Sequence, residues 1–434
     1  METIFALTSG SWQAGVAVVR VSGPKAPQTF ERLTGQALPD PRRATMAVLR
    51  DNGAVLDHAL ALYFKGPASF TGEDVVEYHL HGGRAVIDGV LAALARVEGC
   101  RLAQPGEFTR RAFENGKMDL TEAEAVADLI AAETEAQRDL ALDQLGGGLS
   151  RLYGGWADTL AGFLAHQEAE IEFPDEDLPE GIAAGLKDGI ETLASDITRH
   201  LDDGRKGERL RSGFRVAIIG APNAGKSSLL NALARRDAAI VSEEAGTTRD
   251  IVEVHLNLGG YPFILADTAG LRDTDNAIEV EGIKRAARAA EDADLKIAVF
   301  DAAQDKDTAT QALVDDKTII VLSKADLVDA AVDTGAVLLS SKTGTGIDVL
   351  LKTLAARAEE AFKNKNDGAV LTRTRHREAL LECSDALSRT LHAALPELAA
   401  EDLRMALRAL GRITGRVHVE ELLDKIFKDF CIGK

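Results

Sequence analysis

The spacing of hydrophobic positions changes three times along the chain and predicts four successive regions. In residues 1–118, short apolar runs alternate with turns that are rich in Gly and Pro. The runs 58–64 and 75–80 are typical of strands, and 85–97 has the spacing of a helix. We therefore expect an α+β domain over residues 1–118.

Two stretches, 119–210 and 366–434, are rich in Ala, Glu and Leu at helical spacing. Thr121 followed by Glu124 indicates a capping box that begins the first helix. An acidic loop, 173–177, interrupts the first stretch. We predict that the two stretches are the halves of one helical bundle domain, with their acidic residues on solvated faces.

Between these halves, residues 211–365 alternate strand and helix patterns, as expected for an α/β domain with a mostly parallel sheet. Apolar and polar residues alternate over 251–258, and Gly259-Gly260 then turns the chain into 262–270, which predicts a hairpin. Later strands, each running into a polar loop, are expected in 295–301, 317–326 and 336–344. Ligands bind at the carboxyl ends of strands in such sheets. The chain is thus expected to be an α+β multidomain protein with this domain inserted.

Composition limits the classes of protein that fit. The chain has 434 residues, 45% hydrophobic and 27% charged, which suits a globular protein of about two to four domains. A net charge of -19 argues against broad, non-specific nucleic-acid binding but leaves room for a local basic patch. The three cysteines, Cys100, Cys383 and Cys431, form no C-x-x-C pair, so we expect neither a disulfide framework nor structural zinc. The sequence has no secretory signal pattern and no apolar run of about 18 residues, so we expect a soluble, cytoplasmic protein.

Residues 220–227 read G-x-x-x-x-G-K-S, between a buried apolar run and a helical stretch. This context predicts a phosphate-binding loop, because glycines let backbone amides approach an anion and the helix N-terminus adds partial positive charge. Lys226 is expected to reach the β- and γ-phosphates, and Ser227 to bind Mg²⁺. A glycine turn in front of a core helix is the alternative.

Three later motifs follow in the order of a guanine-nucleotide switch. Gly246–Asp250 offers a Thr hydroxyl for Mg²⁺ and the γ-phosphate. Asp267 begins a D-T-A-G segment, and its carboxylate is expected to reach Mg²⁺. Asp326 can accept hydrogen bonds from guanine N1–H and the exocyclic amine, Lys324 lies along the base plane, and Ser340–Lys342 donates to the guanine carbonyl. The predicted nucleotide contacts are Asn223, Ala224, Gly225, Lys226, Ser227, Ser228, Ser242, Glu243, Glu244, Ala245, Gly246, Thr247, Thr248, Asp267, Thr268, Ala269, Gly270, Ser323, Lys324, Ala325, Asp326, Ser340, Ser341 and Lys342. Of these, Ser227 and Thr248 are the predicted Mg²⁺ ligands.

Two positions depart from the usual pattern. In the motif that usually reads N-K-x-D, Ser323 stands in place of the asparagine. Serine is shorter than asparagine and has one donor, so we expect a weaker link to the phosphate loop and lower nucleotide affinity. We expect the preference for guanine to be retained. Leu271 stands where Ras-like enzymes use Gln, and an apolar side chain cannot orient water. Glu279 is the candidate catalytic residue that positions or polarises water, with a solvated surface role as the alternative. A monovalent cation bridging the phosphates can replace an arginine finger, since catalysis here is mostly electrostatic.

The chain as a whole closely resembles the MnmE (TrmE) family of tRNA-modification GTPases. The resemblance is carried by TIFAL, AVVRVSG, SFTGEDVVEYHLHGG, PGEFTRRAFENGKMDLTEAEAV, GAPNAGKSSLLNAL, GTTRD, DTAGLR, IEVEGIKR and the terminal FCIGK. It implies a tetrahydrofolate-binding and dimerisation domain over 1–118 and a Ras-like P-loop G domain over 211–365. The helical domain is then 119–210 together with 366–434. The first domain and the FCIGK tail distinguish the family from other GTPases such as Era.

The same resemblance implies further site residues. A tetrahydrofolate derivative carrying a methylene or formyl unit is contacted by Arg20, Glu77, Lys117 and Lys434. K⁺ binds beside the phosphates and drives pairing of G domains, with ligands matching Asn223, Ser242, Glu244 and Thr247. Glu279 aligns with the catalytic glutamate. Cys431 matches the tail cysteine, and a small buried residue is its alternative role.

The function that the resemblance implies is a K⁺-dependent GTPase that works with the flavoprotein MnmG. Together they place an aminomethyl-type group on carbon 5 of the wobble uridine of certain tRNAs. The implied assembly is a homodimer that joins MnmG in a heterotetramer. The alternative is a regulatory or ribosome-assembly GTPase whose first domain only binds a partner.

A basic pattern outside these motifs also stands out. Arg404, Arg408, Arg412 and Arg416 recur every four residues, which on one helix gives a basic stripe. Our hypothesis is that the stripe contacts tRNA phosphates or MnmG. Pairing with acidic helices of the same domain is the alternative.

Overall fold

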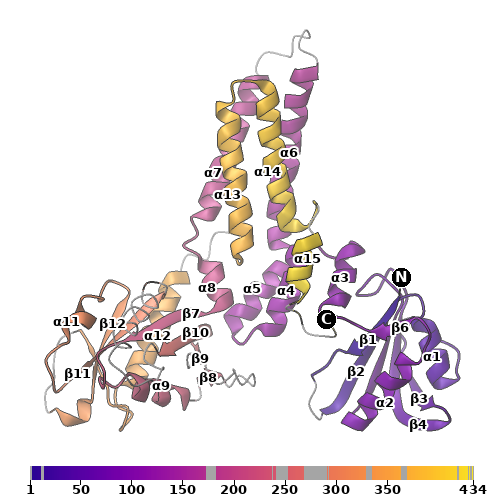
Figure 1. The fold of residues 1–434 in the computed structure, drawn as a ribbon, viewed down its shortest axis with the longest axis horizontal. Coiled ribbons are helices and arrows are strands. Elements are labelled where there is room, and N and C mark those ends of the chain that lie inside the picture. Colours follow the sequence, from indigo (N-terminus) through magenta and orange to yellow (C-terminus); the bar gives the residue numbers. More distant parts are fainter. Residues whose placement is uncertain are drawn as a thin grey trace, which may run out of the picture. The chain divides into compact units, whose positions relative to one another are not determined.

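Figure 1 shows the computed structural model, which describes residues 2–10, 14–172, 182–236, 238–240, 253–267, 291, 293–328, 335–362, 369–417, 420–428, 430 and 433. The chain divides into two compact units. The first consists of Met1–Ala127, Tyr153–Ala157 and Arg408–Lys434, and the second of Asp128–Leu152 and Asp158–Leu407. In the part of the chain described, no helix is both long enough and apolar enough to cross a bilayer.

The first unit is built on a six-stranded sheet with the order β3-β4-β5-β2-β1-β6. Its strands are β1 (Thr3–Leu7), β2 (Ala14–Ser22), β3 (Thr45–Asp51), β4 (Ala54–Phe64), β5 (Val75–Gly82) and β6 (Cys100–Leu102). All pairings are antiparallel except that of β1 with β6. Helices α1 (Ala26–Thr34) and α2 (Arg84–Ala95) pack on the sheet through one apolar cluster that includes Phe30 and Leu94 (Figure 1). The predicted α+β character of this region is confirmed.

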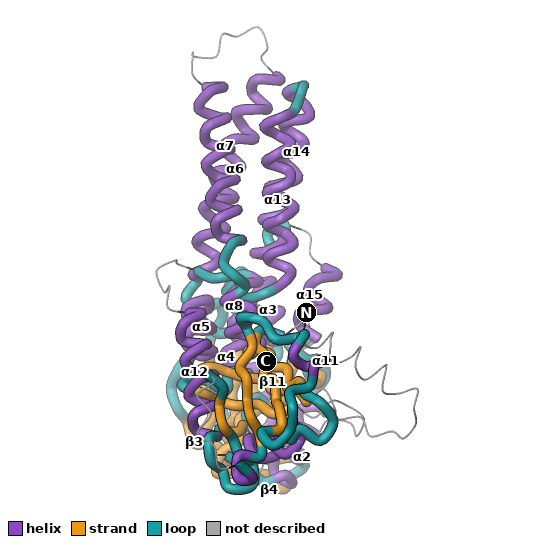
Figure 2. Tube along the Cα trace, turned by 90° about the vertical axis from the view of Figure 1, so that its left-hand side faces the viewer, coloured by secondary structure: helices purple, strands orange, loops and turns teal. Residues whose placement is uncertain are grey.

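Two long stretches of sequence form the helices of a bundle, as predicted. They contain α4 (Leu120–Ala131), α5 (Glu135–Leu145), α6 (Gly148–Glu172), α7 (Ile182–Leu201), α8 (Lys206–Ser212), α13 (Thr374–His392), α14 (Pro396–Thr414) and α15 (Glu420–Lys428). Helix α3 (Glu107–Glu114) precedes them and belongs to the first unit. Helices α7 and α13, from opposite sides of the inserted domain in sequence, lie side by side (Figure 2). The acidic loop predicted at 173–177 lies outside the described residues.

The capping box predicted at Thr121 and Glu124 is wrong by two residues. The N-terminal cap of α4 is Asp119, whose Oδ1 accepts a hydrogen bond from the Glu122 amide at 3.0 Å. Glu122 Oε2 in turn accepts from the Asp119 amide at 2.8 Å. Thr121 and Glu124 are buried inside the helix, 1% and 2% exposed. The helix starts earlier because Leu120, fully buried, already belongs to its apolar face.

The inserted domain has a seven-stranded sheet with the order β13-β12-β11-β7-β10-β9-β8. Its strands are β7 (Phe214–Ile219), β8 (Ala239–Ile240), β9 (Glu253–Leu258), β10 (Tyr261–Asp267), β11 (Leu295–Asp301), β12 (Thr318–Ser323) and β13 (Val337–Leu338). Only β9 runs antiparallel to its neighbours, so the sheet is mostly parallel, as predicted. The helices described in this domain are α9 (Lys226–Ala234), α11 (Thr308–Gln311), the short 3₁₀ helix η1 (Ala325–Leu327) and α12 (Ile347–Phe362).

The predicted hairpin between β9 and β10 is present, and its closed end meets the helical domain at α5. The Ala136 amide donates a hydrogen bond to the Gly260 carbonyl at 3.2 Å. His255 Nδ1 lies 3.6 Å from Glu133 Oε2. The first turn of α5 is held by a capping box in which Thr134 and Gln137 bond each other's backbone amides. The hairpin tip therefore rests on a helix end whose geometry is fixed.

A histidine at the end of α7 links folding stability to pH. Burial lowers the pKa of His200 from its usual 6.5; Asp203 opposes this shift, whereas Arg377 and His376 reinforce it. The unfolded chain thus binds more protons than the folded chain once the pH falls below about 6.5. The contribution of neutral His200 to the free energy of unfolding is therefore complete above that pH. It is lost as the pH falls through the lowered pKa of the folded chain.

We expect the melting temperature to drop between pH 7.5 and pH 5.5, both about one unit from the usual histidine pKa, and His200→Gln to flatten this dependence. Calorimetry across that range measures both. His392→Gln is the matched control, because His392 is exposed on α13. A pH slope for His200→Gln equal to that of the unmodified protein would contradict the assignment.

Candidate functional site

The phosphate-binding loop predicted at 220–227 lies between β7 and α9. A Cβ on Gly220 would lie 2.5 Å from the Val299 carbonyl oxygen, so only glycine fits where the loop passes β11. Gly225, with φ of 102°, leads into α9. Lys226 is 8% exposed, and its Nζ donates to the carbonyls of Gly220 at 2.8 Å and Ala221 at 2.9 Å. The lysine thus curls back over the loop that is predicted to bind phosphates.

The start of α9 provides the remaining donors of the loop. Ser227 and Ser228 are exposed in its first turn, whereas Leu229, Leu230 and Leu233 pack into the core of the sheet. First-turn amides have no acceptor within their own helix, and the helix dipole adds partial positive charge there. A buried apolar side therefore fixes a polar end that suits an anion.

Residues 323–326, at the end of β12 and just after it, were predicted to recognise the base and are called the base-recognition loop below. This loop is held from two sides. Lys324 has a left-handed backbone, with φ of 55°, and its Nζ bonds Asp301 Oδ2 at 2.6 Å. Asp326 Oδ1 accepts from Ser340 Oγ at 2.7 Å, and this bond lowers the pKa of Asp326. Asp326 therefore remains a charged acceptor, with Ser340 and Lys342 on the facing loop.

Ser323 makes the link to the phosphate loop that the sequence led us to expect would weaken. Its Oγ donates to the Ala224 carbonyl at 2.6 Å, and the Phe300 carbonyl lies 3.1 Å away. Ser323 is 4% exposed. Its single proton serves one acceptor well, and the shorter distance favours Ala224. The two loops are thus directly connected through one hydroxyl.

Ser323→Ala should weaken guanine-nucleotide binding without changing guanine preference. It removes one buried hydrogen bond and leaves the Ala224 carbonyl short of a donor, a loss of about 1–3 kcal/mol. We expect affinity for GDP to fall by roughly fivefold or more. Titration of a fluorescent guanine nucleotide measures this. Thr353→Ala, which removes an exposed hydroxyl that bonds within α12, is the control; affinity unchanged in Ser323→Ala would show that the bond does not support the loop.

Several predicted nucleotide contacts lie outside the described residues. They are Ser242, Glu243, Glu244, Ala245, Gly246, Thr247, Thr248, Thr268, Ala269 and Gly270. The predicted catalytic residue, Glu279, also lies outside the described residues. The backbone of Asp267 is described, at the end of β10 and in register with Ile218 of β7. This register puts the start of the D-T-A-G segment at the same sheet edge as the phosphate loop. The roles of the residues that lie outside the described part of the chain remain predictions.

The first unit brings together two of the four residues predicted to contact folate. Arg20 and Glu77 face each other on β2 and β5, and Arg20 Nε bonds Glu77 Oε1 at 2.8 Å. The rings of Phe70 and Phe108 lie 5.2 and 5.7 Å from the Arg20 guanidinium carbon. Lys117 Nζ bonds the Pro67 carbonyl at 3.0 Å, in the loop that carries Phe70. Lys434 and Cys431 lie outside the described residues.

The predicted arginine stripe is only partly correct. Arg404, Arg408 and Arg412 lie on α14, but that helix ends at Thr414, so Arg416 lies beyond it. Arg404 pairs with Glu168 of α6 at 2.8 Å and with Glu401 at 3.1 Å. For Arg404, pairing with acidic residues of its own domain is therefore the supported role.

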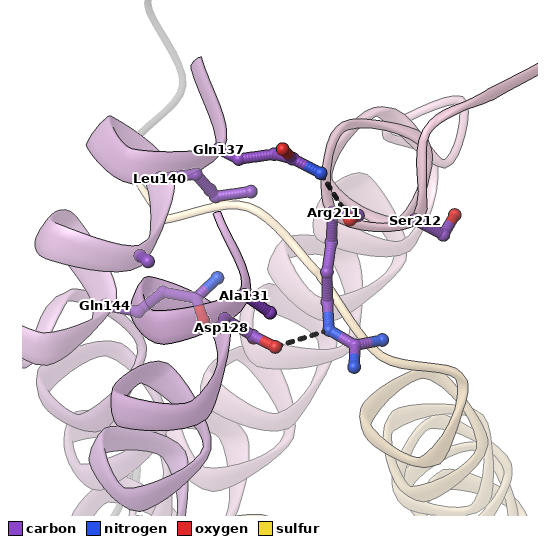
Figure 3. Close-up of a pocket in the computed structure, with 8 residues that line it drawn as sticks. Asp128, Ala131, Gln137, Leu140, Gln144, Arg211 and Ser212 are labelled. Carbon is purple, nitrogen blue, oxygen red and sulfur yellow. Dashed lines mark hydrogen bonds and ion pairs between the residues drawn. The ribbon is translucent and has the colours of Figure 1, made fainter. Parts of the chain in front are cut away.

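A separate cavity of about 220 Å³ lies where α4, α5 and α8 meet (Figure 3). Gln137 Nε2 donates to the Arg211 carbonyl at 3.0 Å, and Arg211 Nε bonds Asp128 Oδ1 at 2.8 Å. Asp128 Oδ1 also accepts from Arg373 at 2.8 Å, just before α13. These bonds join α4, α5 and α8 to the chain entering α13.

Sequence reasoning missed Asp301, the partner of Lys324. The available signal was a buried strand, LKIAVFD, that ends in an acidic residue at the edge where the nucleotide motifs gather.

Comparisons with known proteins show which family the chain resembles. A family model described as the MnmE helical domain matches residues 120–431, and one described as the GTP-binding protein TrmE N-terminus matches residues 3–117. Three relatives carry the description tRNA modification GTPase MnmE, and each alignment covers 100% of both chains. They come from Parvibaculum lavamentivorans, at 55% identity, Paramagnetospirillum magneticum, at 54%, and Rhodospirillum rubrum, at 53%.

Proposed function

The chain belongs to the MnmE family of tRNA modification GTPases, and from this premise we propose that it is a K⁺-dependent GTPase acting on the wobble uridine of certain tRNAs. In the proposed reaction it works with the flavoprotein MnmG, as a homodimer within a heterotetramer. The product carries an aminomethyl-type group on carbon 5, and a tetrahydrofolate derivative supplies the one-carbon unit. The observation that supports the proposal is that one chain contains both the Lys226 loop, which suits phosphates, and the Arg20–Glu77 pair.

The nucleotide site supports the GTPase part of the proposal. Lys226 and the first turn of α9 are suited to the phosphates, and Asp326 to the guanine edge. Ser227 fits Mg²⁺, because an exposed hydroxyl at this helix start is an oxygen ligand beside the phosphate position. Asn223 fits K⁺, since its exposed amide oxygen lies within the phosphate loop. When bound, the two cations spread the negative charge that develops during hydrolysis.

The Arg20–Glu77 pair supports the folate part of the proposal. His79 Nε2 is buried and makes no hydrogen bond, although it lies 3.7 Å from Glu77 Oε2. The guanidinium, carboxylate and imidazole are thus side by side on the sheet, with two phenyl rings over Arg20. A pterin ring offers a flat surface for stacking and an amide-and-amine edge for such polar groups. Tetrahydrofolate, when bound, supplies carbon at the formaldehyde or formate level.

Nucleoside analysis of tRNA from cells that lack the protein tests the proposed product. We expect the carbon-5 group on wobble uridine to be lost, restored by the intact gene and not by Arg20→Ala. Binding of tetrahydrofolate to purified protein should be lost in the same variant. Arg50→Ala is the control, as Arg50 is exposed on β3. Normal wobble nucleosides after deletion would reject the proposal in favour of a regulatory or ribosome-assembly switch.

GTP turnover in K⁺ compared with Na⁺ tests the cation. We expect faster turnover in K⁺, because its size suits a site formed by oxygen atoms around the phosphates. Asn223→Ala should remove the difference. Equal rates in both salts would contradict a K⁺ site at Asn223.

A further inference from the structure

Asp301 ends β11 directly beside the base-recognition loop. In the parallel pairing of β11 with β12, Asp301 is opposite Ser323, the first residue of that loop. The Ala302 amide donates to the Ser323 carbonyl at 3.0 Å, and Ser323 Oγ lies 3.1 Å from the Phe300 carbonyl. The strand end and the loop are thus joined on both sides of Asp301.

The Asp301 side chain is directed at Lys324. Its Oδ2 lies 2.6 Å from Lys324 Nζ, and its Oδ1 accepts from the Ala303 amide at 3.0 Å. The aspartate side chain is 9% exposed and that of Lys324 is 36% exposed. The bond from Lys324, together with the Ala303 amide, lowers the pKa of Asp301, so the carboxylate stays charged at neutral pH. The bond from the Ala303 amide to Oδ1 thus orients the Asp301 carboxylate, and Oδ2 holds the Lys324 ammonium.

This contact fixes both ends of a flexible side chain. The backbone of Lys324 is set in the left-handed region between Ser323, bonded to the phosphate loop, and Asp326, bonded to Ser340. Its ammonium is set by Asp301. A lysine stem has many rotamers in solution, and ordering it only when a ligand arrives weakens binding. Here most of that ordering precedes nucleotide binding.

We propose that Asp301 is a positioning residue for guanine recognition, holding the Lys324 ammonium so that the four-carbon stem stays along the plane of the base. The inference rests on the proposed placement of Lys324 and Asp326 at the guanine ring. The competing explanation is that the ion pair only stabilises the edge of the sheet.

A second ion pair in the same strands provides a matched control. Lys296, at the start of β11, bonds Asp315, just before β12, at 2.8 Å. This pair has the same chemistry and joins the same two strands at their opposite end, away from the nucleotide motifs. Asp301→Asn and Asp315→Asn therefore separate positioning of Lys324 from general support of the sheet.

The test measures binding of a fluorescent GDP analogue and GTP turnover in the full-length protein. For Asp301→Asn we expect a dissociation constant raised roughly fivefold, with KM raised and kcat at saturating GTP unchanged. Asp301→Glu, which retains the charge, should recover part of the loss. Asp315→Asn should bind as the unmodified protein does, and its melting temperature reports any loss of sheet stability.

A double-mutant cycle decides whether the aspartate acts through the lysine. In the Lys324→Ala background, Asp301→Asn should have no further effect on binding. Full additivity of the two losses, or unchanged binding in Asp301→Asn while Lys324→Ala is impaired, overturns the inference and leaves the base site intact. Unchanged binding in Lys324→Ala itself would reject the proposed base site as well.

Discussion

Lys226→Ala should abolish GTP turnover at physiological nucleotide concentrations. The lysine is the one side chain of the 220–227 loop whose ammonium reaches across it, bonding the carbonyls of Gly220 and Ala221. With nucleotide present, the same ammonium is placed to make charge-assisted bonds to the β- and γ-phosphates, where positive charge matters most. We expect the affinity for GTP to fall by at least about a hundredfold.

Radiometric phosphate release and nucleotide titration measure this loss. Lys352→Ala, an exposed lysine of α12 in the same domain, is the control and should behave as the unmodified protein does. Far-ultraviolet circular dichroism verifies that the Lys226 variant folds. Turnover in that variant within a few-fold of normal would exclude 220–227 as the phosphate site.

Asp326→Asn should change which base is bound. The carboxylate offers two acceptors to the N1–H and amine of guanine, whereas an amide offers one acceptor and one donor. Losing a charge-assisted pair of hydrogen bonds should lower the GTP affinity by a factor of roughly a hundred. Xanthine carries a carbonyl where guanine has its amine, so the asparagine donor suits it. Binding of xanthosine triphosphate should therefore rise.

Competition between guanosine and xanthosine triphosphates measures the exchange. Asp316→Asn is a suitable control, because Asp316 is exposed in the same domain. An Asp326 variant that still prefers GTP would place the base elsewhere. The bond from Ser340 Oγ keeps the side chain of residue 326 oriented in either form.

The order of helices and strands could be predicted from the sequence, because in most of them the spacing of apolar residues matches the face that is buried in the fold. The β9–β10 hairpin, for example, combines alternating polarity with a Gly-Gly turn. Agreement is weaker at boundaries. Residues 336–344 were predicted to contain a strand that runs into a polar loop, and the strand, β13, is only Val337–Leu338, the two residues that pair with β12. The boundaries at 118, 210 and 365 remain predictions.

The candidate site was predictable where a motif fixes chemistry and spacing together, as in 220–227. It was less predictable where contacts depend on register. Ser323 was expected to weaken the link to the phosphate loop, and that expectation stays a prediction. That a link exists at all depends on β12 ending close enough to Ala224 for a short side chain to reach it. Asp301 was missed because only the pairing of β11 with β12 brings it beside Lys324.

The β9–β10 hairpin has a mechanical consequence. Its open end borders residues 241–252 and 268–290, where the sequence places the groups that sense the γ-phosphate, and its closed end is bonded to α5 through Gly260. The hairpin is stiff along its length, because six residue pairs hold its strands in register and β10 is also paired with β7 of the same sheet. A displacement of these strands is therefore expected to reach the start of α5 through the bond between Gly260 and Ala136.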